Sequence, residues 1–178
     1  MAGWITLGAL AALAGCGGGT HGFAREYSPL GEEDEYFETA SPVGYEEVRR
    51  DPAAFASSTV GWFGIVANVE ADSSGRAVVS LTHRIHQPRH LCQDERASSC
   101  RVTVSDRSNG TFTTTLTLRP EERESGEDRL WIGSLVKIYG SPTGQFDAQG
   151  GPILEARYHR HWPRGAYVTT GAARSMRR

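Results

Sequence analysis

Short runs of β-branched and aromatic residues, separated by glycine, are the feature that most constrains the fold of this chain. Runs bounded by turn residues are typical of β-strands, and this pattern favours an all-β domain. The 21 glycines supply the turns, and a hydrophobic fraction of 38% suffices for one modest core. The expected strands span residues 59–71, 76–86, 101–106, 111–118, 133–140 and 150–163. The sequence therefore predicts one β domain over residues 44–165.

The segments on either side of this domain differ from it in character. Residues 44–56 predict a short helix, because Tyr45 and Val48 share a helix face and Asp51-Pro52 is typical of a helix start. Residues 16–43 are rich in glycine and acidic residues and predict a flexible tether. Residues 166–178 predict a basic tail. We expect both charged ends to be solvated, and attraction between them is the alternative.

The N-terminus predicts export. Residues 4–13 form an apolar core of the length that a secretory signal needs, too short to cross a bilayer as a helix. The next residues, Leu13-Ala14-Gly15-Cys16, resemble the lipobox of bacterial lipoproteins. The resemblance implies a signal peptide over residues 1–15 and palmitate-bearing lipid on Cys16. It also implies an outer-membrane anchor facing the periplasm, because Gly17 rather than aspartate follows the cysteine.

A long first strand that bends at glycine resembles the first strand of an OB-fold barrel. We therefore predict an OB-like barrel of five to six strands, preceded by the short helix and the lipid-anchored tether. After the leader, the chain contains the motifs DPAAF, GWFGIV, GTF, GSLVKIYGSPTG and ILEARYHRHWP. With these motifs it resembles the starvation-inducible outer-membrane lipoprotein (Slp-like) family over residues 45–163. That family has no established catalytic residues to carry over.

The two remaining cysteines form an even pair in an oxidising compartment. Cys92 and Cys100 enclose a polar loop of seven residues, and we predict a disulfide that closes it. In the chain-entropy model such a short loop contributes about 2.5 kcal/mol to stability.

Two groups of histidines are candidate ligands for zinc, because imidazole is a common zinc ligand. The candidates are His83, His90, His159 and His161. His159 and His161 share one face of an expected strand. We expect that face to point to solvent, because Leu154, Ala156, Tyr158 and Trp162 are better suited to the core.

A ligand surface is the other candidate site, because OB barrels bind oligonucleotides and oligosaccharides on one face. Trp62, Arg84 and Arg101 could form it, and an envelope location favours a glycan or protein partner over nucleic acid. We therefore predict a non-catalytic, lipid-anchored envelope protein without a cofactor, which has a structural or binding role. A zinc-binding lipoprotein is the alternative. A periplasmic hydrolase is less favoured, because Ser105, Asp106 and Ser134 lie in no recognisable nucleophile motif.

Overall fold

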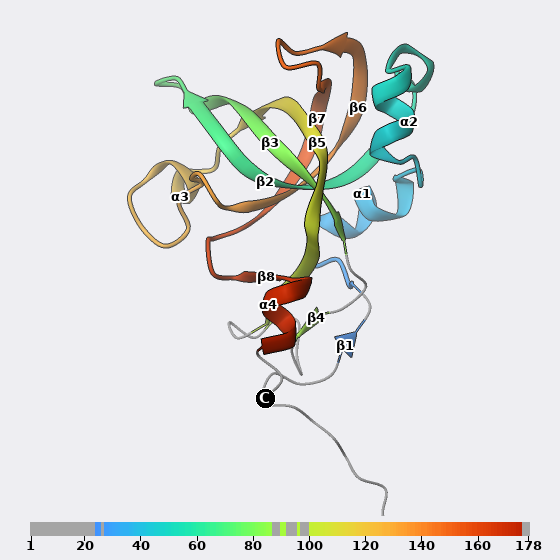
Figure 1. Cartoon of the computed structure of the whole chain (residues 1–178). Helices are drawn as coiled ribbons and strands as arrows, with labels where there is room; N and C mark the ends of the chain where they lie inside the picture. Colours follow the sequence, from blue (N-terminus) through green and yellow to red (C-terminus); the bar gives the residue numbers. More distant parts are fainter. Residues whose placement is uncertain (1–23, 26, 87–89, 92–95, 97–99, 176–178) are drawn as a thin grey trace, which may run out of the picture.

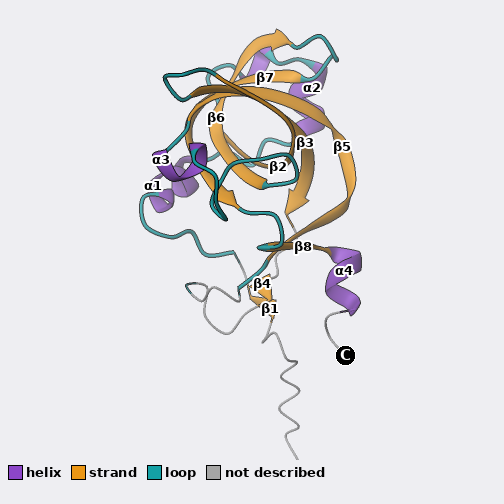
Figure 2. Cartoon of the chain, turned by 90° about the vertical axis from the view of Figure 1, so that its left-hand side faces the viewer, coloured by secondary structure: helices purple, strands orange, loops and turns teal. Residues whose placement is uncertain are grey.

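A computed structural model describes residues 24–25, 27–86, 90–91, 96 and 100–175 of the chain. Its main feature is a closed barrel of five strands, seen nearly end-on in Figure 2. A short sixth strand extends the sheet, and a separate two-stranded sheet lies beside the barrel (Figure 1). The barrel strands are β2 (Val60–Ala71), β3 (Arg76–His86), β5 (Val102–Thr117), β6 (Leu135–Phe146) and β7 (Pro152–Trp162). The sixth is β8 (Tyr167–Thr169), and β1 (Ala24–Arg25) pairs with β4 (His90–Leu91).

The order of the strands confirms the OB-like barrel. The sheet runs β3-β2-β6-β7-β5, and β3 closes it by pairing with β5. Within the barrel all neighbours are antiparallel except β5 and β7, which are parallel, and the added strand β8 is also parallel to β5. Gly64 lets β2 pass close to β3, because a Cβ there would lie 2.8 Å from the Cβ of Leu81.

Residues 101–106 and 111–118, expected as two strands, belong to one long strand, β5. The polar stretch between them resembles a turn in the sequence. In the structure it stays extended, and its pairing with β3 shifts register twice, between Thr82 and Arg84 and between Arg84 and His86. Gly110, at φ +134°, takes up the backbone conformation that other residues rarely adopt.

Four α-helices and one 3-10 turn accompany the strands in the described part of the chain. They are α1 (Glu33–Thr39), α2 (Tyr45–Arg50), the 3-10 turn Ala53–Phe55, α3 (Pro120–Arg123) and α4 (Thr170–Ser175). The expected helix over 44–56 is present as α2 and the turn. No helix among the described residues is long and apolar enough to cross a membrane.

Both expected ends of the domain need correction where the structure describes them. The expected tether contains α1, whose Glu33 is fully buried against the barrel. The expected basic tail contains β8, which pairs with β5, and α4, which follows it. The sequence pattern missed both because each element is short and is held by tertiary contacts rather than by its own periodicity.

Three apolar clusters hold the described elements together, the smallest formed by Leu91, Val168 and Ala173. The largest one fills the barrel and includes Tyr45 and Val48 of α2 and Leu130 after α3. The second lies on the outer face of the sheet, where Phe63, Leu135 and Trp162 pack with Val102 and Val104. Tyr27 of the N-terminal segment packs on this second cluster. The outer face of β2, β6 and β7 is therefore covered by the segment that leads into α1.

Candidate binding groove

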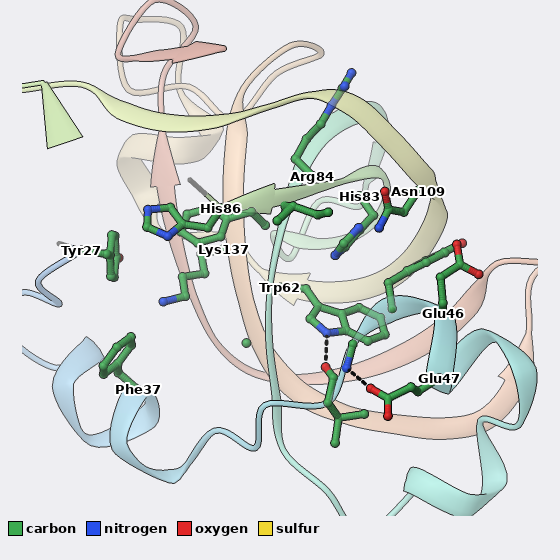
Figure 3. Close-up of a pocket in the computed structure, with 16 residues that line it drawn as sticks. Tyr27, Phe37, Glu46, Glu47, Trp62, His83, Arg84, His86, Asn109 and Lys137 are labelled. Atoms are coloured by element: carbon green, nitrogen blue, oxygen red, sulfur yellow. Dashed lines mark hydrogen bonds between the residues drawn. The ribbon is translucent and has the colours of Figure 1, made fainter. Parts of the chain in front are cut away.

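A groove of about 620 Å³ lies where β2 and β3 separate. These strands pair from Phe63 and Arg84 to Ala71 and Ala77, so the first residues of β2 and the last of β3 border an opening. Figure 3 shows the N-terminal segment with α1 on one side of the groove and α2 on the other. Its lining comes from Tyr27, Phe37, 43–47, 61–63, 83–86, Asn109 and Lys137.

The floor of the groove is a packed set of aromatic rings. The Trp62 indole N–H donates a hydrogen bond of 3.0 Å to the carbonyl oxygen of Val43, which fixes the ring. Tyr45 stacks on His83 with ring centroids 4.8 Å apart, and Trp62 meets His83 edge-on at 5.6 Å. The Tyr45 hydroxyl donates to the carbonyl oxygen of Thr111 at 2.8 Å. The floor is therefore rigid before any ligand arrives.

His83 is an unusual component of this floor. It is 6% exposed, and its Nδ1 atom is buried without a hydrogen-bond partner. Burial, with a smaller effect from the neighbouring Arg84, lowers its pKa to about 4. His83 is therefore neutral at pH 7 and presents an uncharged imidazole to the groove.

Lys137, the one lysine of the chain, lies at the end of the groove beside α1 (Figure 3). Its ammonium lies 4.1 Å from the ring centroid of Tyr27, 4.7 Å from Phe37, 4.6 Å from Tyr139 and 5.1 Å from Phe63. Such distances allow cation–π attraction to all four rings. Burial lowers the pKa of Lys137 to about 8, although nearby Glu33 opposes the shift.

Glu33 binds α1 to the barrel through four partners, a set that we call the Glu33 clamp. Its carboxylate accepts hydrogen bonds from the hydroxyls of Tyr27 and Tyr139 and from Arg160, the last at 2.7 Å. The Lys137 Nζ lies 3.5 Å from the same carboxylate. Burial alone would raise the pKa of Glu33, but these hydrogen bonds and charges outweigh it and lower the pKa. The clamp thus joins an ionised carboxylate on α1 to cations on β6 and β7.

The residues expected to form one ligand surface are divided between two places. Trp62 lies in the floor of the groove, and Arg84 borders it. The Arg84 guanidinium, however, donates to the carbonyl oxygen of Asp106. Arg101 lines a different cavity of about 680 Å³ beside the exposed Trp131. The sequence did not predict the Glu33 clamp. The one lysine of this arginine-rich chain, Lys137, was the feature that could have drawn attention to it.

The expectation that His159 and His161 face solvent is wrong. Tyr139 pairs with Tyr158 but Gly140 pairs with Ala156, so one extra residue, Arg157, lies between the paired positions of β7. This β-bulge reverses the alternation of faces along the rest of the strand. The side chains of His159 and His161 are only 10% and 4% exposed beside α3, where the His159 Nε2 lies 3.0 Å from each carboxylate oxygen of Glu122. Trp162, expected in the barrel core, packs in the outer cluster instead.

The histidine candidates for zinc do not form one group in the described structure. His83 lies in the groove floor and His159 and His161 near Glu122, while the side chain of His90 lies outside the described residues. Among the side chains that the structure describes, no three of His, Cys, Asp and Glu are placed to hold a metal ion.

Cys16 and Cys92 also lie outside the described residues. Lipidation of Cys16 and the disulfide between Cys92 and Cys100 therefore stay predictions. Peptide mapping without reduction should recover the two loop cysteines in one linked peptide pair. Free thiols at both positions in protein from an oxidising compartment would contradict the disulfide.

No family model matches this chain, and no curated protein matches it. The function is therefore argued from the groove itself.

Proposed function

We propose that this protein is a non-catalytic, lipid-anchored binding protein of the bacterial cell envelope and holds a partner molecule in the groove. The observation that carries the proposal is the groove itself: an aromatic floor bordered by two apolar side chains that stay exposed. Phe37 is 42% exposed on the α1 side, and Ile85 is 48% exposed on the β3 side. The volume of about 620 Å³ lies within the range of ligand-binding sites.

The chemistry of the groove favours recognition of a partner over a reaction with it. Lys137 is held by four rings and Glu33, and the Trp62 indole is fixed by Val43. His83 is uncharged at neutral pH. Such groups provide shape, stacking surface and hydrogen bonding, which are the usual means of recognition in a largely apolar site.

The cellular location is argued from the N-terminus. The lipobox at Cys16 and the resemblance to the Slp-like lipoproteins support an anchor in the outer membrane facing the periplasm. Cys16→Ser should abolish incorporation of labelled palmitate and release the chain from the membrane fraction or leave it unprocessed. A wild-type chain that takes up no label would contradict the anchor.

The groove is tested by site-specific photo-crosslinking in cells. A photo-reactive benzoylphenylalanine at position 37 should give an adduct of defined mass, because that side chain lies at the groove. The matched control places the same residue at position 146, since Phe146 is 47% exposed and does not line the groove. Adducts from both positions alike, or from neither, would contradict a role for the groove.

A further inference from the structure

We propose that the occupant of the groove is a basic, extended segment of a partner polypeptide, with apolar side chains between its arginines or lysines. This inference rests on the binding function proposed above and adds the chemistry of the partner. It combines the charge along the groove with the two apolar side chains that remain exposed there.

The segment from α1 through the start of α2 gives the groove an acidic border. Residues 32–47 contain seven acidic residues and no lysine or arginine. Only Glu33 among them is buried and neutralised by the clamp; the other six are exposed. Glu46 and Glu47 of α2 line the groove directly, and Phe37 of α1 lies on its other side (Figure 3).

The cations near the groove offset this charge only in part: Arg49 pairs with Glu46 at 3.2 Å, and the clamp holds two cations against the one carboxylate of Glu33. Lys137 is paired with Glu33 and enclosed by aromatic rings. Arg84 points away from Trp62 and α2 in Figure 3, and its guanidinium bonds to Asp106. His83 is neutral. Six exposed carboxylates still exceed these cations, so a positively charged partner meets a net negative border. Charge of opposite sign speeds encounter and selects among partners.

The apolar side chains indicate that the partner is larger than a simple cation. Phe37 of α1 and Ile85 of β3 both line the groove, and both remain about half exposed. A small cation would leave them in water. Arginine and lysine carry apolar stems as well as charge, and an arginine can stack on an exposed ring such as Phe37. A peptide of alternating basic and apolar residues satisfies both features.

Binding of short fluorescent peptides to the purified full-length protein, measured by anisotropy, tests the inference. A peptide of alternating arginine and leucine should bind at least about tenfold more tightly than one of alternating glutamate and leucine. Its affinity should fall as salt is raised to about 0.5 M, because exposed charges are then screened within a few ångströms. A serine–leucine peptide should bind with intermediate affinity.

Matched variants locate the binding. Glu35→Gln, Glu38→Gln and Glu46→Gln should each weaken binding by about 1.4- to 5-fold, the range of an exposed ion pair. Phe37→Ala should weaken it by about fivefold through the lost ring. The control changes an exposed acid and an exposed ring elsewhere, Glu127→Gln and Phe146→Ala, and should leave the affinity within about twofold.

Two results would overturn the inference and leave the proposed function standing. One is equal binding of all three peptides with dependence on Phe37. The other is no peptide binding while position 37 still forms its defined crosslink. An equal loss of binding in Glu127→Gln would also overturn the inference, because it would indicate unspecific attraction of charge. Absence of both peptide binding and the crosslink would refute the inference and the proposed function together.

Discussion

Replacing His83 with phenylalanine should remove a defined part of the acid sensitivity of this fold. Burial lowers the pKa of His83 from 6.5 to about 4, so the unfolded chain takes up this proton at a higher pH than the folded chain. Between these two values the proton favours unfolding, and stability falls as pH falls. From about pH 7.5 to about pH 5 the two pKa values imply a loss of about 2 kcal/mol from His83 alone.

The structure makes phenylalanine a suitable replacement. The site is aromatic, with Tyr45 stacked on the ring and Trp62 and Phe112 at its edges. Phenylalanine keeps the ring and removes the buried Nδ1 atom that has no partner. Stability at neutral pH should therefore change by less than about 1 kcal/mol.

Urea unfolding at several pH values measures the effect directly. The difference in unfolding free energy between about pH 7.5 and pH 5 should be about 2 kcal/mol smaller in His83→Phe than in wild type. His161, whose pKa burial also lowers to about 4, titrates in both proteins and cancels from the comparison. If His83→Phe lost as much stability as wild type on acidification, the assignment of a buried, neutral His83 would be refuted.

Two further substitutions test the clamp and the long strand by the same unfolding measurement. Glu33→Gln removes the charge that Arg160 and Lys137 share and should cost about 3 kcal/mol, whereas Glu35→Gln on the exposed side of α1 should stay within about 0.5 kcal/mol. Equal effects of the two would contradict the clamp. Gly110→Ala should cost about 2 kcal/mol or more, because φ is +134° and the new Cβ would lie 2.3 Å from the Tyr45 hydroxyl oxygen. Gly126→Ala, with open space around it, should change stability by no more than about 0.5 kcal/mol, and a similar loss there would contradict the steric argument.

The barrel could be predicted because each strand is indicated by residues within its own segment. Alternating apolar residues and the glycines between them set strand positions, and the expected strand at 76–86 coincides with β3. The expected strand at 59–71 differs from β2 by one residue. Each of these patterns lies within one segment, so it can be recognised in the sequence without knowledge of the strand pairing.

The faces of β7 could not be predicted in the same way. The alternation of side chains along a strand gives the faces of His159 and His161 correctly only if no bulge precedes them. The bulge at Arg157 arises from the pairing of β7 with β6, which the sequence pattern does not show. The close approach of Gly140 to the Glu155 backbone belongs to the same irregularity, since a Cβ there would lie 2.3 Å from the Glu155 carbonyl oxygen. One inserted residue therefore places two histidine side chains, expected in solvent, beside Glu122 with exposures of only 10% and 4%.

The groove depends on contacts between residues that lie far apart in the sequence. Glu33 and Arg160 are separated by 127 positions, and the aromatic rings around Lys137 come from the N-terminal segment, β2 and β6. In the sequence, Glu33 is one member of an acidic run that predicts a solvated surface. Only the fold shows that this one carboxylate is buried and that its neighbours remain exposed beside the groove.

The same segment also connects the groove to the proposed membrane anchor. Residues 27–47 supply Tyr27 and Phe37 at one end of the groove and 43–47 at the other. Toward the N-terminus, this segment leads back to Cys16. The Glu33 clamp includes Tyr27 and Glu33 of this segment and fixes α1 on the barrel through β6 and β7. Because the clamp holds the segment on its N-terminal side, the shape of the groove is set by the barrel rather than by the tether. In the proposed lipid-anchored state, a groove held in this way takes its geometry from contacts with the barrel.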